Sequence, residues 1–297
     1  MDPTVPLAPP RRRRGLRAGV RALLVLALVL LLSGGAAVLV GPGPWRWSEA
    51  PRDVAIDGAP AAPPATATPA PATDRPTAGV EAAPFPLGFP LWPPRDGGAY
   101  EFLSLQADGV TPVAYDPCRP IHYVIRPDGA PAGGEEVVRS AIDRMSEVTG
   151  LHFVDDGVSD EATTIDRPIF QPDRYGDRWA PVLIAWETEE QNPELAGVTV
   201  GQAGSVAVSL GDGPRVFVTG TVSLDAGQFP GILDLRDGAA TARAIVLHEL
   251  GHLVGLAHVD DAGQLMYPEA RRDDRDFAAG DLTGLARLGR GQCVPEL

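Results

Sequence analysis

The stretch HELGHLVGLAHVDDAGQLMYP, residues 248–268, concentrates side chains that can bind a metal ion. Three of the chain's five histidines, His248, His252 and His258, lie in it, and Glu249 directly follows the first. Histidines four residues apart share one face of a helix, where both imidazoles can reach the same ion. The full spacing H-E-x-x-H-x-x-G-x-x-H is much more specific than a pair of histidines packed in an apolar core, so it predicts a metal site.

The spacing also predicts which chemistry this metal would support. Gly255 can end the helix in a left-handed conformation, after which the chain turns back and brings His258 to the same point. Three imidazoles leave a fourth position open for water, as in catalytic zinc sites. Zinc lowers the pKa of that water to about 7, and Glu249 could take its proton as the water attacks a carbonyl. We therefore predict His248, His252 and His258 as zinc ligands and Glu249 as the general base.

A methionine follows this motif, because Met266 lies eight residues after His258 in the sequence LMYP. HELGHLVGLAH followed by LMYP resembles the metzincin zinc endopeptidases, and the wording LMYP is most similar to the matrixins, including small bacterial ones. The resemblance covers roughly residues 99–297 and is strong over 240–268. It implies an α+β zincin fold with a mixed twisted sheet, an active-site helix, a methionine turn at Met266 and a C-terminal helix.

The resemblance further implies that an edge strand between residues 198 and 225 pairs with an extended protein or peptide substrate. It assigns residues 269–280 to the wall of a specificity pocket. The arginines of this segment would favour acidic side chains of the substrate; alternatively, they are solvated loop charges. An endopeptidase is the favoured function because the base Glu249 is intact. Two alternatives stay open: a zinc-retaining binding module that cleaves nothing, and a hydrolase of non-peptide amides or esters.

The remaining sequence predicts the elements that position this motif. Apolar residues at helical spacing predict a helix over 135–150 that stops at Gly150, and an uncharged run predicts a long buried helix over 238–255. Asp281 is the expected N-cap of a closing helix over 281–289. Strands are predicted over 120–127, 151–156 and 180–187, and twice more between 198 and 225. Together these elements predict a single α+β domain over residues 98–297.

Other metal sites are less clearly indicated. Asp155, Asp156 and Asp160 cluster after a predicted strand, where they could bind calcium or form a solvated acidic loop. Matrixins hold a second, structural zinc ion with additional histidines. Only His122 and His152 remain for that purpose, so the resemblance gives no expectation of a second zinc here.

The N-terminal third predicts export. Residues 1–21 carry six arginines, and residues 22–40 are apolar and uncharged. This order predicts a cytoplasmic tail and a transmembrane signal-anchor with the catalytic domain outside the cell membrane. A cleaved signal peptide, which would give a secreted protein, is the alternative. Residues 41–97 are rich in proline, alanine and threonine, which predicts a disordered stalk.

The net charge excludes one class of binding partner, and the two cysteines indicate a disulfide. The net charge of −14, despite the basic tail, argues against nucleic-acid binding. Cys118 and Cys293 lie near the two ends of the predicted domain, and in an exported protein they favour one disulfide over two buried thiols. The matrixin latency motif PRCGxPD is absent, and the motif around Cys118, DPCRP, is only a faint echo of it. We expect a monomer.

Overall fold

The computed structural model describes residues 46–49, 52–56, 74–95, 97–270 and 275–297. The basic tail and the apolar segment 22–40 lie outside the described residues, so the topology expected for them stays a prediction. Among the described helices, none combines the length and the apolar character that crossing a membrane requires.

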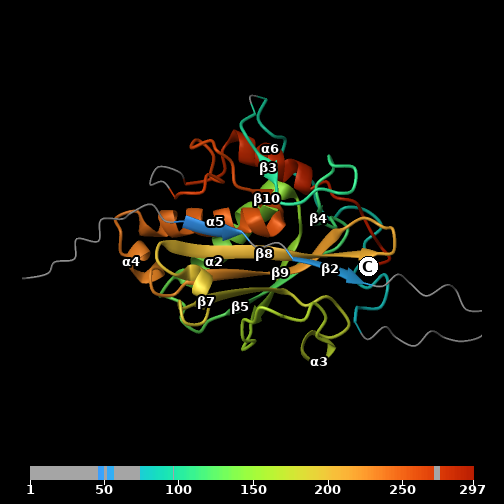
Figure 1. Ribbon diagram of the computed structural model, residues 1–297, viewed down its shortest axis with the longest axis horizontal. Coiled ribbons are helices and arrows are strands. Elements are labelled where there is room, and N and C mark those ends of the chain that lie inside the picture. The colour runs from blue at the N-terminus through green and yellow to red at the C-terminus, as the bar shows by residue number, and fades with distance from the viewer. Residues whose placement is uncertain (1–45, 50–51, 57–73, 96, 271–274) are drawn as a thin grey trace, which may run out of the picture. The chain divides into compact units, whose positions relative to one another are not determined.

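The described residues form a mixed sheet that carries its main helices on one face (Figure 1). Its five central strands are β5 (Ile121–Arg126), β6 (Phe153–Val158), β7 (Val182–Glu187), β8 (Thr199–Leu210) and β9 (Val216–Asp225). They lie in the order β8-β9-β7-β5-β6, in which β8 and β9 are antiparallel and all other neighbours are parallel. Three short strands add to this sheet: β1 (Arg46–Glu49) and β2 (Arg52–Ile56) pair with β8, and β4 (Ala114–Tyr115) pairs with β9.

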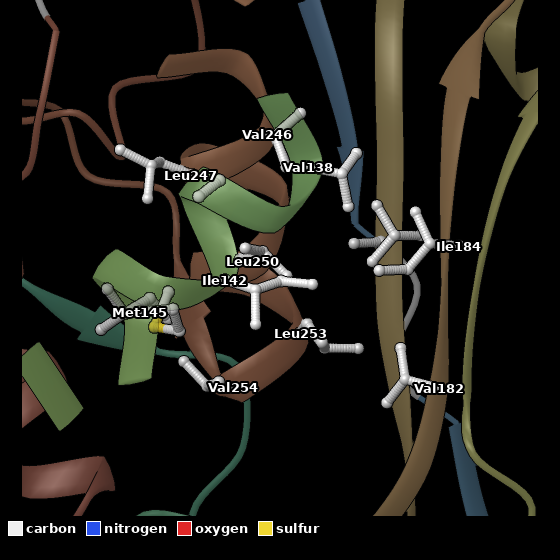
Figure 2. Close-up of a cluster of buried hydrophobic side chains, with 14 of the residues drawn as sticks. Val138, Ile142, Met145, Val182, Ile184, Val246, Leu247, Leu250, Leu253 and Val254 are labelled. Atoms are coloured by element: carbon white, nitrogen blue, oxygen red, sulfur yellow. The ribbon is translucent and has the colours of Figure 1, made fainter. Parts of the chain in front are cut away.

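The helices include α2 (Gly134–Thr149), α3 (Pro172–Tyr175), η1 (Pro193–Leu195), α4 (Phe229–Leu233), α5 (Gly238–Val254) and α6 (Ala279–Leu288). A two-stranded ladder joins β3 (Glu101–Phe102) to β10 (Leu256–Ala257). Figure 2 shows α2 and α5 packed together on one side of the sheet, with Ile142 of α2 against Leu250 of α5. Each such buried side chain contributes about 1.5–3 kcal/mol.

Burial on all sides distinguishes α5 from the other helices. Every residue from Ala244 to Val254 is buried, including the polar residues His248, Glu249 and His252. Because packing fixes the helix from both the α2 side and the sheet side, these three polar side chains occupy a rigid part of the core.

The observed bounds agree with the predicted elements to within two residues. Gly150 ends α2 with a φ of 69°, and Gly255 ends α5 with a φ of 121°. The prediction for Asp281 is wrong: α6 begins at Ala279, so Asp281 is its third residue and not its N-cap. Its carboxylate still serves the helix start, because it accepts a hydrogen bond from the N–H of Ala278 at 2.9 Å.

Residues 74–95 differ from the stalk that the composition predicts, because they lie along the body. The N–H groups of Ala83, Leu87 and Leu91 donate to the carbonyls of Cys118, Pro117 and Val148, respectively. Apart from the turn bonds from Val80 to Thr77 and from Ala82 to Gly79, the extended backbone of this segment leaves its polar groups able to pair with a neighbouring segment. The folded body therefore includes these residues as well as those after 97.

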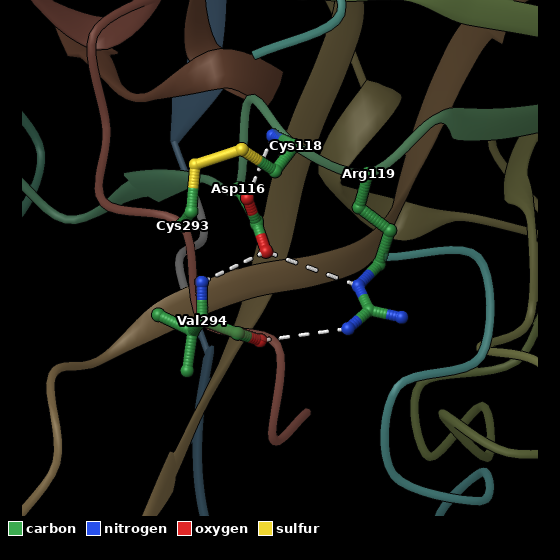
Figure 3. The surroundings of a disulfide bond; sticks show 5 residues. All are labelled: Asp116, Cys118, Arg119, Cys293 and Val294. Atoms are coloured by element: carbon green, nitrogen blue, oxygen red, sulfur yellow. Dashed lines mark hydrogen bonds and ion pairs between the residues drawn. A yellow bond between two sulfur atoms is a disulfide. The ribbon is translucent and has the colours of Figure 1, made fainter. Parts of the chain in front are cut away.

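A disulfide joins Cys118 to Cys293, whose Cα atoms lie 5.4 Å apart (Figure 3). The carboxylate of Asp116 accepts hydrogen bonds from the N–H groups of Cys118 and Val294 at 2.7 and 3.0 Å. The bond links positions 175 residues apart. Native disulfides are typically worth about 2–5 kcal/mol, so this bond is a main tie between the segment before β5 and the C-terminal residues.

Candidate metal centre

Helix α5 and the turn that follows it bring three imidazoles to one point. His248 and His252 project from the same face of α5, and their Nε2 atoms are 3.0 Å apart. After the helix ends at Gly255, the chain passes through β10 and returns His258, whose Nε2 lies 3.1 Å from each of the other two. The structure thus assembles the three predicted ligands in the geometry of a single metal site.

Backbone carbonyls set the proton positions of two rings. Nδ1 of His248 donates to the carbonyl of Leu265 at 2.7 Å, and Nδ1 of His252 donates to the carbonyl of Leu256 at 2.8 Å. A ring that carries its proton on Nδ1 keeps a lone pair on Nε2, which is the atom directed to the centre. Lone pairs this close repel one another, and a cation held between the rings relieves that repulsion. The donor set fits zinc, which prefers imidazole nitrogen.

The surroundings favour the neutral form of these rings. Burial, followed by the neighbouring His252 and His258, lowers the pKa of His248 well below its usual value. Removal from water disfavours the charged imidazolium, and a neutral imidazole is the form that binds a metal ion. Protonation of His248 therefore competes only weakly with metal binding.

Glu249 lies beside the three rings and is itself fully buried. The neighbouring strand β8 approaches it at Gly201: a Cβ atom added there would lie 2.5 Å from Oε1 of Glu249. Only glycine leaves room for the carboxylate at this point. Sequence analysis did not single out Gly201, and the only available sign was a glycine inside a strand, which often marks a close approach.

The segment of the predicted methionine turn lies directly against α5. Met266 is buried, and a Cβ atom added at Gly251 would come within 2.6 Å of its sulfur. The glycine inside HELGH therefore lets Met266 reach the helix between the two ligands. The methionine turn itself stays what the resemblance implies for Met266.

Asp281 holds this turn from the other side. Its buried carboxylate accepts hydrogen bonds from the N–H groups of Leu265 at 2.7 Å and Met266 at 3.3 Å. The carbonyl of Leu265 in turn accepts the proton of His248, so one peptide unit connects Asp281 to a candidate ligand. Burial raises the pKa of Asp281 to about 6, although its backbone hydrogen bonds act in the opposite direction. The ionised carboxylate of Asp281 therefore holds the turn at a cost in electrostatic free energy.

Of the two interpretations of the acidic cluster, a calcium site or a solvated acidic loop, the described residues show no group of ligands that would support calcium. Asp155, Asp156 and Asp160 each pair with a separate basic side chain: Arg139, His122 and Arg174, respectively. An acidic run that follows a strand can be neutralised by arginines from elsewhere in the fold, and a local sequence pattern does not show that. His122, one of the two remaining histidines, belongs to this ion-pair network.

Comparison with known families agrees with this geometry. The family model Peptidase_M10, described as Matrixin, matches residues 182–288. This segment is matrixin-like. It contains β7, β8, β9, α5, the methionine turn and α6, and hence every candidate site residue. The match supports a matrixin-like metzincin catalytic domain, a class of zinc metalloproteases that hydrolyse peptides.

The other comparisons add little. No curated protein matches the chain. Among solved structures, a chain from "GM1 bound form of the ECX AB5 holotoxin" is similar with a TM-score of 0.35 and 13% identity, over 58% of this chain and 81% of that chain. A TM-score this low carries no argument about fold or function.

The contact between Gly201 and Glu249 yields a test. We expect Gly201→Ala to displace the Glu249 carboxylate and lower peptide hydrolysis about 100-fold, because small displacements of a catalytic group are costly. Zinc content should not change. The control is Gly231→Ala in α4, where an added Cβ atom meets nothing within 4 Å. Equal activity of the two variants would show that β8 does not position Glu249.

The raised pKa of Asp281 yields a second test. Between about pH 4 and 6 the folded protein retains a proton on Asp281 that the unfolded chain releases, so stability falls as the pH rises through this window. Asp281→Asn lacks this titration. We expect the unfolding free energy of the wild type, relative to the variant, to be about 2 kcal/mol lower at pH 7 than at pH 4. Urea unfolding of both metal-free proteins measures it; a difference independent of pH would contradict the assignment.

Proposed function

We propose that this protein is a zinc-dependent endopeptidase in which Glu249 is the general base. The observation that carries the proposal is the convergence of three histidine Nε2 atoms, all within 3.1 Å, beside a buried glutamate in a matrixin-like segment. A zinc ion bound there would lower the pKa of a water ligand and polarise the carbonyl of the peptide bond.

The chain's own residues then supply position and proton transfer. His248 and His252, fixed through their Nδ1 hydrogen bonds, would hold the metal on α5. Glu249 is about 100° from His248 around the helix, so its carboxylate can reach the attacking water without binding the metal. It takes the proton of that water and passes it to the nitrogen of the leaving amine. Burial of Glu249 limits its motion and excludes bulk water.

We assign substrate binding to β8 and not to β9. Of the two predicted strands, β9 is paired on both sides by β8 and β7, whereas β8 is the outermost of the five central strands. Gly201 places β8 next to Glu249. An extended peptide that pairs with this strand would gain backbone hydrogen bonds that do not depend on its sequence, with its scissile bond near the base.

The preference of the enzyme for particular substrate side chains stays a prediction. Of the three arginines in the segment 269–280, Arg271 and Arg272 lie outside the described residues. Arg275 donates to the hydroxyl of Thr241, so its guanidinium contacts α5, the helix that carries the candidate metal site. A preference for acidic substrate side chains is compatible with this position.

We also propose that the catalytic body acts outside the cell membrane, either tethered by residues 22–40 or released after signal-peptide cleavage. The support is the Cys118–Cys293 disulfide, since such bonds persist in oxidising compartments. The arginine-rich start followed by the uncharged apolar segment supports the same orientation.

The direct test of the proposed activity uses a denatured casein-like substrate. We expect Glu249→Gln to keep one zinc ion per chain but to lower hydrolysis about 1,000-fold or more, because it removes the proton acceptor. A zinc chelator should abolish the wild-type activity. Glu194→Gln, a change at an exposed glutamate, is the matched control. A zinc-loaded wild type that cleaves no protein would favour the binding module, and cleavage of esters or simple amides alone would favour the non-peptide hydrolase.

Localisation is tested on intact cells that produce the full chain. Externally added protease should digest the catalytic body without lysis. Sequencing of the mature N-terminus separates the two forms, because a start near Val38 indicates a cleaved signal and retention of residues 1–21 indicates an anchor. A body that is protected until the cells are lysed would refute the proposed location.

A further inference from the structure

The segment 84–92, PFPLGFPLW, exposes a group of large apolar side chains to water. They are Phe85, Leu87, Phe89, Leu91 and Trp92. The three aromatic rings among them have exposed fractions of 76, 83 and 89%. Single exposed apolar residues are ordinary on a protein surface, whereas a contiguous group marks a site that binds another protein or a membrane. We call these five side chains the apolar strip.

The backbone beneath the apolar strip is fixed to the body. Two of its N–H groups donate to the carbonyls of Pro117 and Val148. Gly88 lies directly against Gly150, because a Cβ atom added at Gly88 would come within 2.4 Å of the Gly150 carbonyl oxygen. The three prolines of the segment fix their own φ angles. The strip is therefore a pre-formed surface, which loses little conformational entropy when it binds.

One arginine stacks on the apolar strip, and a second lies close to it in sequence. The guanidinium of Arg290 covers the ring of Trp92, 5.8 Å from its centroid, and Arg287 lies three residues earlier, near the end of α6. Both arginines are exposed, and neither forms an ion pair with a carboxylate in the described part of the chain. Exposed aromatic rings beside such cations are typical of surfaces that enter the headgroup region of a bilayer.

The acidic side chains around the apolar strip are already paired. Glu81, which precedes the strip, lies 3.1 Å from His122, and Glu147 at the end of α2 lies 2.6 Å from Arg144. The Debye length is about 8 Å at physiological ionic strength, so most of the protein's other negative charges are screened from this surface. The local charge is therefore positive, although the net charge of the chain is −14.

A bilayer fits the apolar strip better than a protein partner does. The prolines lack N–H groups and other N–H groups already donate to the body, so a partner cannot add to the segment as a paired strand. A bilayer needs no such donors. Positions 41–84, a span of 44 residues, separate the strip from the predicted anchor 22–40. A tether of this kind gives an effective concentration in about the millimolar range.

We propose that the apolar strip, together with Arg287 and Arg290, docks the catalytic body onto an anionic phospholipid bilayer. Phe85, Phe89 and Trp92 enter the interface between headgroups and acyl chains, and the two guanidiniums contact lipid phosphates. The docking does not depend on the proposed function. Its consequence does: a body held at the bilayer cleaves proteins at the membrane surface in preference to those in free solution.

The test places a fluorescent reporter in the apolar strip of the full chain. Trp45→Phe with Trp47→Phe leaves Trp92 as the exposed tryptophan, because Trp179 and Trp186 are buried. This parent variant is reconstituted in vesicles of phosphatidylcholine and phosphatidylglycerol whose acyl chains carry bromine near the headgroup. We expect the emission of Trp92 to shift to the blue and to lose intensity, since bromine quenches only on contact. Adding Trp92→Phe should abolish the loss.

Two pairs of substitutions in this parent separate docking from tethering. Phe85→Ser with Phe89→Ser should lower the ratio of docked to undocked chains at least about tenfold, because it removes two buried rings. Val110→Ser with Ile165→Ser, at two exposed apolar positions outside the strip, is the matched control and should change nothing.

The role of charge is tested with Arg290→Gln. On vesicles that contain phosphatidylglycerol, this variant should lower the ratio of docked to undocked chains about fivefold, the typical effect of one cation near an anionic surface. On vesicles of phosphatidylcholine alone it should have no effect. Equal losses on both kinds of vesicle would contradict recognition of anionic lipid.

The remaining outcomes are distinct. Emission of Trp92 that brominated lipid does not quench would overturn the proposal. Equal quenching in the parent and in the Phe85→Ser, Phe89→Ser variant would also overturn it, because the tether alone would then bring Trp92 to the bilayer. Protection from iodide without quenching by bromine, rising with the number of chains per vesicle, would assign the strip to a second copy of the chain. A docked chain that cleaves no protein would refute the proposed function and leave the docking supported.

Discussion

The hydrogen bond from His248 Nδ1 to the carbonyl of Leu265 is the interaction on which the whole site depends. It fixes the tautomer of a candidate zinc ligand, and it joins α5 to the methionine turn in the same contact. Asp281 accepts a hydrogen bond from the N–H of Met266 on the other side of that peptide unit, although burial raises the pKa of its carboxyl group. A ligand, a turn and the closing helix α6 are thus coupled through a single peptide bond.

The rigid packing around α5 explains how such a polar site persists in a core. Unpaired polar groups are costly to bury, and two of the imidazoles avoid part of that cost through their carbonyl partners. Their remaining nitrogen atoms are directed at one another, which leaves a metal ion as the group that completes the site. Glycines at positions 201 and 251 let β8 and Met266 pack closely against the helix, so that neither Glu249 nor the segment around Met266 has free space in which to move.

The sequence predicted the parts of this structure that depend on local patterns. The ligand spacing, the helix over 238–255 and its stop at Gly255 all follow from residues within one or two helical turns of each other. The roles of Gly201 and Asp281 could not be predicted, because each arises from contact with a segment distant in the sequence. The same holds for residues 46–49, 52–56 and 74–95: composition indicates how little apolar surface they can bury, but it does not show which backbone they pair with.

The measurement that tests the central claim most directly is X-ray absorption at the zinc edge of the purified full chain. The arrangement of three Nε2 atoms predicts one zinc ion per chain, with three imidazole nitrogens at about 2.0–2.1 Å and one oxygen ligand. His258→Ala should reduce the number of imidazole nitrogens by one. A site with four protein ligands, with sulfur in the coordination shell, or with no zinc at all would contradict the account.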